Sequence, residues 1–137
     1  MPLEIKMQQT IGEQNALSVT VYLAGSLDSA TTPELERELA PVVAEPIRKL
    51  VFDLADLKFI SSAGLRAFAV VGKHLGPSGA QVSFIHLQPQ IQVVFEIIKN
   101  LPSVSVFKDL AEMDRFLALQ QSRQIGEIQS HTIRTPE

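Results

Sequence analysis

The sequence predicts an α/β domain built on a mixed, mostly parallel β-sheet. Short apolar segments typical of strands alternate with amphipathic segments typical of helices, in the order β-β-α-β-α-β-α-β-α. The first two strands are separated only by a short turn. Strands that alternate with helices form parallel sheets, whereas two strands joined by a tight turn pair as an antiparallel hairpin. We therefore expect a single domain with an N-terminal hairpin and about four helices.

Alternating side chains predict the N-terminal hairpin. Every second residue in 3–9, LEIKMQQ, is apolar, as in a half-buried strand. The polar residues 12–15, GEQN, supply the turn. Residues 16–24, ALSVTVYLA, alternate in the same way and are rich in β-branched side chains, which predicts the second strand.

A helix is predicted to begin at Thr32 and Pro33. Threonine is suited to cap a helix, and proline is favoured at the first helical position. Glu34 and Glu36 place negative charge near the positive end of the helix dipole. The apolar face of this helix is formed by Leu35, Leu39, Val42 and Val43.

The middle of the chain predicts a buried strand followed by a helix. Residues 49–54, KLVFDL, form a short and nearly continuous apolar run, which favours a central strand. Residues 62–75 carry apolar side chains at helical spacing, and GPSG at 76–79 ends that helix. The helical face contains Leu65, Phe68, Ala69, Gly72 and Leu75.

Two further strand and helix pairs are predicted in the C-terminal half. Residues 81–87 form a strand, and a helix opened by a proline follows over 89–100. A short strand at 104–107 then precedes a last helix over 109–119. Residues 120–137 are polar and weakly patterned, and we expect a flexible tail there. The domain is thus expected to span residues 1–119.

Composition excludes several classes of protein. The chain has 45% hydrophobic and 20% charged residues, which is typical of a soluble globular protein. Its net charge of -3, without a long run of one sign, does not indicate a nucleic-acid partner. Cysteine is absent, which removes disulfides, thiol catalysis and thiolate metal sites. No segment has the length of a membrane span or the pattern of a signal peptide, so we expect a cytoplasmic protein.

The residue pattern does not indicate an enzyme. His74, His86 and His131 lie near a helix end, within a strand and in the tail, and no two have metal-ligand spacing. Asp53 and Asp56 are expected to end a strand and to lie in a turn. The sequence contains no nucleotide-binding glycine loop and no hydrolase signature. We therefore expect no catalytic residues, no cofactor and no metal.

Ser61 and Ser62 allow two interpretations. Either serine could cap the helix that starts there, which contributes about 1 kcal/mol. A serine at a helix N-terminus is also a good place for a phosphate, because free amides and the dipole stabilise added negative charge. Gly64, in the first turn, costs about 1 kcal/mol against alanine and leaves bare backbone that another molecule can approach.

Residues 53–68, DLADLKFISSAGLRAF, resemble the signature of the STAS domain of bacterial anti-sigma factor antagonists. GSLD at 25–28 resembles the G-x-L-D element after the second strand of that family. Residues 84–117 resemble its C-terminal half, in which a strand, a helix, a short strand and a final helix follow one another. The resemblance covers roughly residues 3–119.

The resemblance implies a phosphate-controlled switch. In this family, the unphosphorylated antagonist binds an anti-sigma factor, usually also an ATP-binding serine kinase, and frees the sigma factor. Phosphorylation ends the binding, and a serine phosphatase restores it. The family motif D-S-[ST]-G-L aligns its modified serine with Ser62. Ser61 then takes the place of the aspartate and is a second candidate acceptor, and Ala63 replaces a hydroxyl residue. The implied partner surface contains Asp28, Ser61, Ser62, Ala63, Gly64, Leu65 and Arg66.

Several alternatives stay open. Arg66 could contact a phosphate or an acidic partner, or simply be a solvated arginine, and Asp28 could instead only close a turn. The chain could be a STAS adaptor subunit of a lipid transporter or a stress-sensing assembly, with no phosphate cycle. It could also be a small α/β enzyme or ligand-binding protein with a pocket near Ser62 and Asp28.

Overall fold

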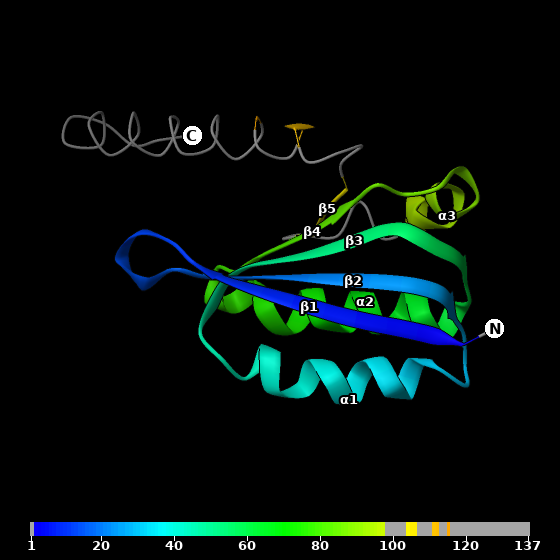
Figure 1. The fold of residues 1–137 in the computed structure, drawn as a ribbon, viewed down its shortest axis with the longest axis horizontal. Helices are drawn as coiled ribbons and strands as arrows, with labels where there is room; N and C mark the ends of the chain where they lie inside the picture. The colour runs from blue at the N-terminus through cyan, green and yellow to red at the C-terminus, as the bar shows by residue number, and fades with distance from the viewer. Residues whose placement is uncertain (1, 98–103, 107–110, 113–114, 116–137) are drawn as a thin grey trace.

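In the part of the chain that the structure describes, the fold is one five-stranded sheet with helices packed against it (Figure 1). The computed structural model describes residues 2–97, 104–106, 111–112 and 115. The strands are β1 (Leu3–Ile11), β2 (Leu17–Leu27), β3 (Ile47–Ile60), β4 (Gln81–Ile85) and β5 (Val104–Val106). The helices are α1 (Thr32–Val43), α2 (Ser62–Leu75) and α3 (Pro89–Val94), with short 3-10 turns at Glu13–Asn15, Gly76–Ser78 and Phe95–Ile97.

The predicted fold class is confirmed. The strands follow one another across the sheet in the order of the chain. β1 and β2 pair antiparallel as a hairpin, and the pairs β2–β3, β3–β4 and β4–β5 are parallel. Helices α1 and α2 lie next to each other on one side of the sheet (Figure 1). Three of the expected helices are described, whereas most of the fourth, over 109–119, and the tail, 120–137, lie outside the described residues.

A cluster of phenylalanines fixes α2 on the sheet. The ring of Phe68 in α2 lies 4.9 Å from the rings of Phe52 in β3 and Phe84 in β4, measured between centroids. Phe95 lies 4.9 Å from Phe84 in an edge-on arrangement. All four side chains are fully buried. Tilted ring pairs add about 0.5–1.5 kcal/mol each beyond the burial of their area, so this cluster holds the helix and its first turn in one position.

β3 is longer than predicted. It runs over 14 residues instead of the expected 49–54, because its second half pairs with β2. Asp56 therefore lies within the strand, opposite Ala24, and its expected place in a turn is wrong. The register shifts between Asp53 and Asp56, where β3 holds one more residue than β2. The carboxylate of Asp53 accepts a hydrogen bond from the Ala55 amide at 3.1 Å, and this bond stabilises the bulge.

Side-chain amides complete the other edge of β3. β4 pairs with β3 only along residues 49–53. Beyond that point, Gln88 Nε2 donates to the carbonyl oxygen of Ala55 at 2.6 Å, and Gln90 Nε2 donates to that of Lys58 at 3.2 Å. The two amides hold the start of α3 against the far half of β3.

The sequence predicted that His86 lies within a strand, and this prediction is wrong. β4 ends at Ile85, and His86 adopts a left-handed backbone with a φ of 62°. This turn brings its Nδ1 to 3.1 Å from the carboxylate of Asp53. Non-glycine residues adopt a left-handed backbone only rarely, so a histidine is a much weaker sign of such a turn than a glycine.

Candidate functional site

Ser61 caps helix α2. Its backbone is extended, with φ of -94° and ψ of 175°, and its hydroxyl accepts a hydrogen bond from the amide of Gly64 at 3.4 Å. Its carbonyl oxygen accepts the amide of Leu65 at 3.0 Å. This is the geometry of an N-cap residue. The cap function that the sequence left open between two serines therefore belongs to Ser61.

Ser62 is the first residue of α2 and has an exposed side chain. The structure shows no hydrogen bond of its hydroxyl to any described residue. Arg66, one turn further along the same helix, is also exposed, and Ala63 is half-buried. The hydroxyl of Ser62 is thus accessible, and it holds no contact together within the described part of the chain.

Gly64 is explained by packing inside the protein. A Cβ atom at this position would lie 2.7 and 2.8 Å from side-chain atoms of Leu27 and 3.1 Å from Ile60. Gly64 and Leu65 are both buried. The side of Gly64 that lacks a side chain therefore faces the interior. The expectation that it leaves bare backbone for another molecule to approach is wrong. The part of Gly64 and Leu65 in a partner surface stays a prediction.

Asp28 closes a turn at the end of β2. Its carboxylate oxygen accepts the amides of Ala30 and Thr31, both at 3.0 Å. The hydroxyl of Thr31 accepts the amide of Asp28 at 2.9 Å and donates to the carbonyl oxygen of Ser26 at 2.8 Å. The hydrogen bond from the Thr31 amide is the main reason that the pKa of Asp28 lies below its ordinary value. The turn-closing interpretation is confirmed, while contact with a partner stays a prediction.

The two polar segments meet at one end of the sheet. Leu27 and Ile60 are paired at the carboxyl ends of the parallel strands β2 and β3. The amide of Ser61 donates to the carbonyl oxygen of Leu27 at 2.8 Å. The structure therefore brings the 28–31 turn next to the start of α2. We call residues 28–31, 61–63 and 66 the strand-end surface.

Phe59 is a further candidate that the sequence pattern did not indicate. It lies two residues before Ser61 and is 51% exposed, although it is large and apolar. A second register shift places Phe59 opposite Ser26, while Leu57 pairs with Gly25, so β3 again holds one extra residue. A bulge interrupts the alternation of side chains along a strand. The simple pattern L-K-F-I therefore gave no signal that Phe59 points outward.

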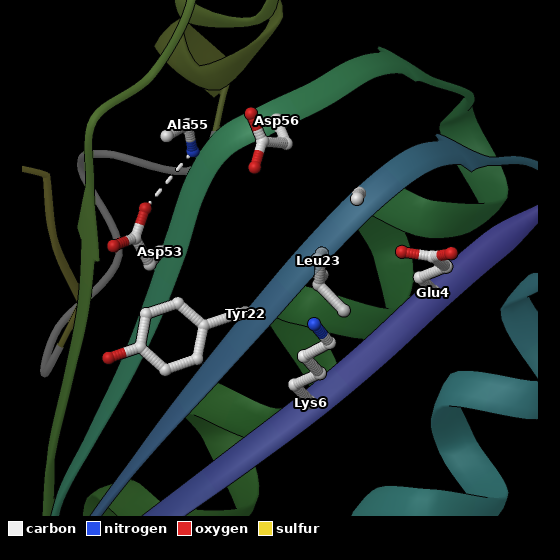
Figure 2. Close-up of a pocket in the computed structure, with 8 residues that line it drawn as sticks. Glu4, Lys6, Tyr22, Leu23, Asp53, Ala55 and Asp56 are labelled. Atoms are coloured by element: carbon white, nitrogen blue, oxygen red, sulfur yellow. Dashed lines mark hydrogen bonds between the residues drawn. The ribbon is translucent and has the colours of Figure 1, made fainter.

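A hollow of about 150 Å³ lies over the N-terminal three strands (Figure 2). It is lined by Glu4, Lys6, Tyr22, Leu23, Ala24, Asp53, Ala55 and Asp56. The hydroxyl of Tyr22 donates to Gln8 Oε1 at 3.3 Å. A second groove, of about 210 Å³, lies between α1 and α2. Neither is lined by Ser62 or Asp28, so these hollows do not support the ligand-binding alternative at the strand-end surface.

The described part of the chain has neither a membrane-spanning helix nor a cluster of metal ligands. No helix there is long and apolar enough to cross a membrane. No group of three or more histidine, aspartate or glutamate side chains in that part is arranged to hold a metal ion.

Most of the chain matches a known protein family. The family model described as "STAS domain" matches residues 5–113. This chain belongs to the STAS domain family. The match includes the strand-end surface and both helices that pack beneath the sheet, α1 and α2.

Curated relatives of this STAS domain carry the name anti-sigma factor antagonist. BtrV of Bordetella bronchiseptica is 41% identical over 75 residues, which cover 55% of this chain and 65% of BtrV. The anti-sigma-F factor antagonist RsfB of Mycobacterium tuberculosis is 32% identical over 69 residues, which cover 50% of this chain and 56% of RsfB. The anti-sigma-B factor antagonist of Staphylococcus aureus is 30% identical over 62% of this chain and 81% of its own. The match thus spans less than two thirds of BtrV and of RsfB.

Solved structures share the fold of this STAS domain. The anti-sigma factor antagonist SpoIIAA in its unphosphorylated form has a TM-score of 0.58 and 15% identity, over 86% of this chain and 98% of SpoIIAA. The phosphorylated form of SpoIIAA from Bacillus has a TM-score of 0.61, with 14% identity over 82% and 99%. The murine anion transporter Slc26a9 has a TM-score of 0.65, with 12% identity over 85% of this chain and 22% of the transporter.

Proposed function

We propose that this STAS domain is an anti-sigma factor antagonist that is switched at Ser62. In its unphosphorylated form, it binds an anti-sigma factor that is also a serine kinase, and the sigma factor is released. The observation that supports the proposal is that two adjacent serines have different structural roles. Ser61 uses its hydroxyl to cap α2, whereas the hydroxyl of Ser62 is exposed and has no described partner in the fold.

The physics of the site favours a local switch. A phosphate on Ser62 adds a charge of about -1.5 to -2 at the positive end of the α2 dipole, where negative charge is stabilised. The fold is therefore expected to tolerate the modification. A partner that covers Ser62 must instead lose contact, because the phosphate adds bulk and must be stripped of water. Dephosphorylation by a serine phosphatase restores binding, and we place this cycle in the cytoplasm.

The proposed binding surface combines a polar and an apolar part. The polar part is the strand-end surface, in which Ser62 and Arg66 are exposed. The apolar part is Phe59, whose ring is half exposed where β3 leads into Ser61. Large aromatic side chains at the centre of an interface typically contribute most of its binding energy. Phe59 is therefore the proposed anchor, and Ser62 is the group that controls access to it.

The first test is a pulldown from source-cell lysate depleted of ATP. The baits are the wild-type chain, Ser62→Glu, and Thr10→Glu as a control that adds the same charge near the hairpin turn. We expect an ATP-binding kinase with wild type and Thr10→Glu but not with Ser62→Glu. The captured kinase and ATP should then phosphorylate wild type, and Ser62→Ala should take up no phosphate.

Two results would contradict the switch. Phosphate on Ser62→Ala but not on Ser61→Ala would move the acceptor to Ser61. Recovery of one multi-subunit or membrane-transport assembly by all three baits would favour the adaptor alternative. The fold of an anion transporter domain resembles this chain, so such an assembly is a realistic competing outcome.

A further inference from the structure

Among the residues that the structure describes, β1 is an edge strand with one unpaired side. The sheet begins with β1, and β2 is its neighbour along all nine residues without a register shift. The amide of Gly12 donates to the carbonyl oxygen of Ala16, and the amide of Ser26 donates to that of Pro2. Both hydrogen bonds fit this register. Bonded pairs recur at every second residue of an antiparallel ladder. The backbone groups of Leu3, Ile5, Met7, Gln9 and Ile11 therefore point away from β2.

The side chains of β1 divide between the two faces of the sheet. Glu4 and Lys6 are exposed and line the hollow on the face away from α1 and α2 (Figure 2). No ion pair of either side chain is found within the part of the chain that the structure describes. Ile5 and Met7 point to the opposite face, where they pack against the core but stay partly exposed. The edge thus presents two opposite charges on one face and partly covered apolar groups on the other.

We infer that two copies of this chain pair through β1, antiparallel, with the two-fold axis at Ile5. In this register, Ile5 lies opposite Ile5 of the partner subunit, and Leu3 lies opposite the partner subunit's Met7. Both pairs are bonded pairs, because the free backbone groups belong to these residues. Glu4 then lies opposite the partner subunit's Lys6 in a pair without backbone bonds, where side chains approach most closely.

Charge selects this register over its neighbours. A two-fold axis at Lys6 would place Lys6 opposite Lys6 of the partner subunit, and like charges directly opposite each other are destabilising. An axis at Met7 would place Lys6 opposite the partner subunit's Gln8 and Glu4 opposite the partner subunit's Thr10, without an ion pair. The axis at Ile5 forms two ion pairs by symmetry, as the self-complementary interface of a two-fold dimer requires.

The pairing also covers apolar surface and closes an edge. Ile5 and Met7, and Leu3 beside them, would form a continuous apolar row across both copies on the side of α1 and α2. The two sheets would become one, so the exposed backbone groups of β1 would gain partners. None of the strand-end residues takes part, so this inference stands apart from the proposed switch at Ser62.

The test is a charge swap measured by sedimentation. Wild type should show a concentration-dependent monomer–dimer equilibrium. Lys6→Glu and Glu4→Lys should each weaken dimerisation about tenfold or more, since each converts two ion pairs into two like-charge contacts. The double variant Glu4→Lys with Lys6→Glu should restore the wild-type equilibrium. Unchanged far-UV circular dichroism and melting would show that the variants fold, as expected for two exposed side chains.

A control separates the registers. Thr10→Glu lies on the same face of β1, outside the overlap when the axis is at Ile5, and should leave the dimer unchanged. If the axis were at Met7, that substitution would face Glu4 of the partner subunit and weaken the dimer. If wild type is monomeric at all concentrations, the inference is wrong, and Lys6 is instead a charged side chain that prevents the edge strand from pairing with another chain. The inference is also wrong if neither Lys6→Glu nor Glu4→Lys changes the dimerisation equilibrium.

Discussion

The amide of Ser61 donates a hydrogen bond of 2.8 Å to the carbonyl oxygen of Leu27, which joins the start of α2 to the end of β2. These residues are 34 positions apart in the sequence, and neither is charged. The bond fixes the backbone from which the Ser62 side chain projects. It also makes the turn at Asp28 and the first turn of α2 one structural unit, whose parts can be tested separately.

Ser62→Glu should leave stability nearly unchanged. The side chain is exposed and the added carboxylate lies at the favourable end of the helix dipole, so the free energy of unfolding should change by less than about 0.5 kcal/mol. Urea denaturation of wild type and variant measures this. A large loss of stability would mean that the variant abolishes binding through unfolding and not through a local charge.

Ser61→Ala should destabilise the protein, in contrast to Ser62→Ala. Loss of an N-cap hydroxyl costs about 1 kcal/mol, whereas the hydroxyl of Ser62 has no hydrogen bond to any residue that the structure describes. Ser61→Asp should retain full stability, because aspartate caps helices as well as serine does. Equal stability of the two alanine variants would contradict the assignment of the cap. The aspartate of the family motif would then occupy this position for a reason other than capping.

Gly64→Ala should lower the melting temperature, although alanine favours helices by about 1 kcal/mol over glycine. The new methyl group would lie less than 3.0 Å from two atoms of Leu27, and overpacking of this kind typically costs about 1–3 kcal/mol. Leu27→Ala in the same chain should relieve the clash. The double variant is therefore expected to be more stable than the sum of the two single changes predicts. Strict additivity would show that the two sites do not touch.

Asp28→Asn should destabilise the protein in a pH-dependent way. The pKa of Asp28 is lowered in the folded state, mainly by the Thr31 amide, so its charged form stabilises the fold. That stabilisation is complete above the ordinary pKa of 3.8 and is lost as the pH falls through the lowered folded value. Thermal melts of both proteins should differ at neutral pH and converge in acid. A difference that grows on acidification would have the wrong sign.

Phe59→Ala should weaken partner binding more than it weakens the fold. Half of the side chain is already exposed, so the cavity cost should be small compared with that of a buried phenylalanine. Truncation of an aromatic anchor in an interface typically costs 2 kcal/mol or more, on the order of thirtyfold in Kd. Titration calorimetry with the captured kinase measures the effect. Tyr22→Ala, which truncates a second exposed aromatic residue outside the proposed binding surface, serves as the control.

The parts of the fold that depend on local signals were predictable. Helix α2 begins and ends where expected, because a serine cap precedes it and Gly76 and Pro77 end it. The hairpin and the parallel strands followed from alternation and spacing. By contrast, the C-terminal end of β3 was not predicted, because two of its three register shifts interrupt the alternation there, and these shifts depend on pairing with β2.

The sequence motif named candidate residues for the site but could not separate their structural roles. The motif pointed to Ser61, Ser62 and Gly64 together. Only the structure shows that Ser61 is the cap and that Gly64 makes room for Leu27, a residue 37 positions earlier. Contacts between distant segments cannot be read from the local sequence pattern. The exposure of Phe59 was not predicted for the same reason, because it depends on how β3 pairs with β2.

The position of Tyr22 makes the protein its own optical probe. The chain contains one tyrosine and no tryptophan, so its ultraviolet emission comes almost entirely from that ring. The ring is 40% exposed beside the hollow, between Lys6 of β1 and Asp53 of β3 (Figure 2). Any event at the hairpin edge should change the polarity around the ring and therefore its emission intensity. Unlabelled protein can thus report on β1 in real time, while events at Ser62, on another part of the surface, are followed independently.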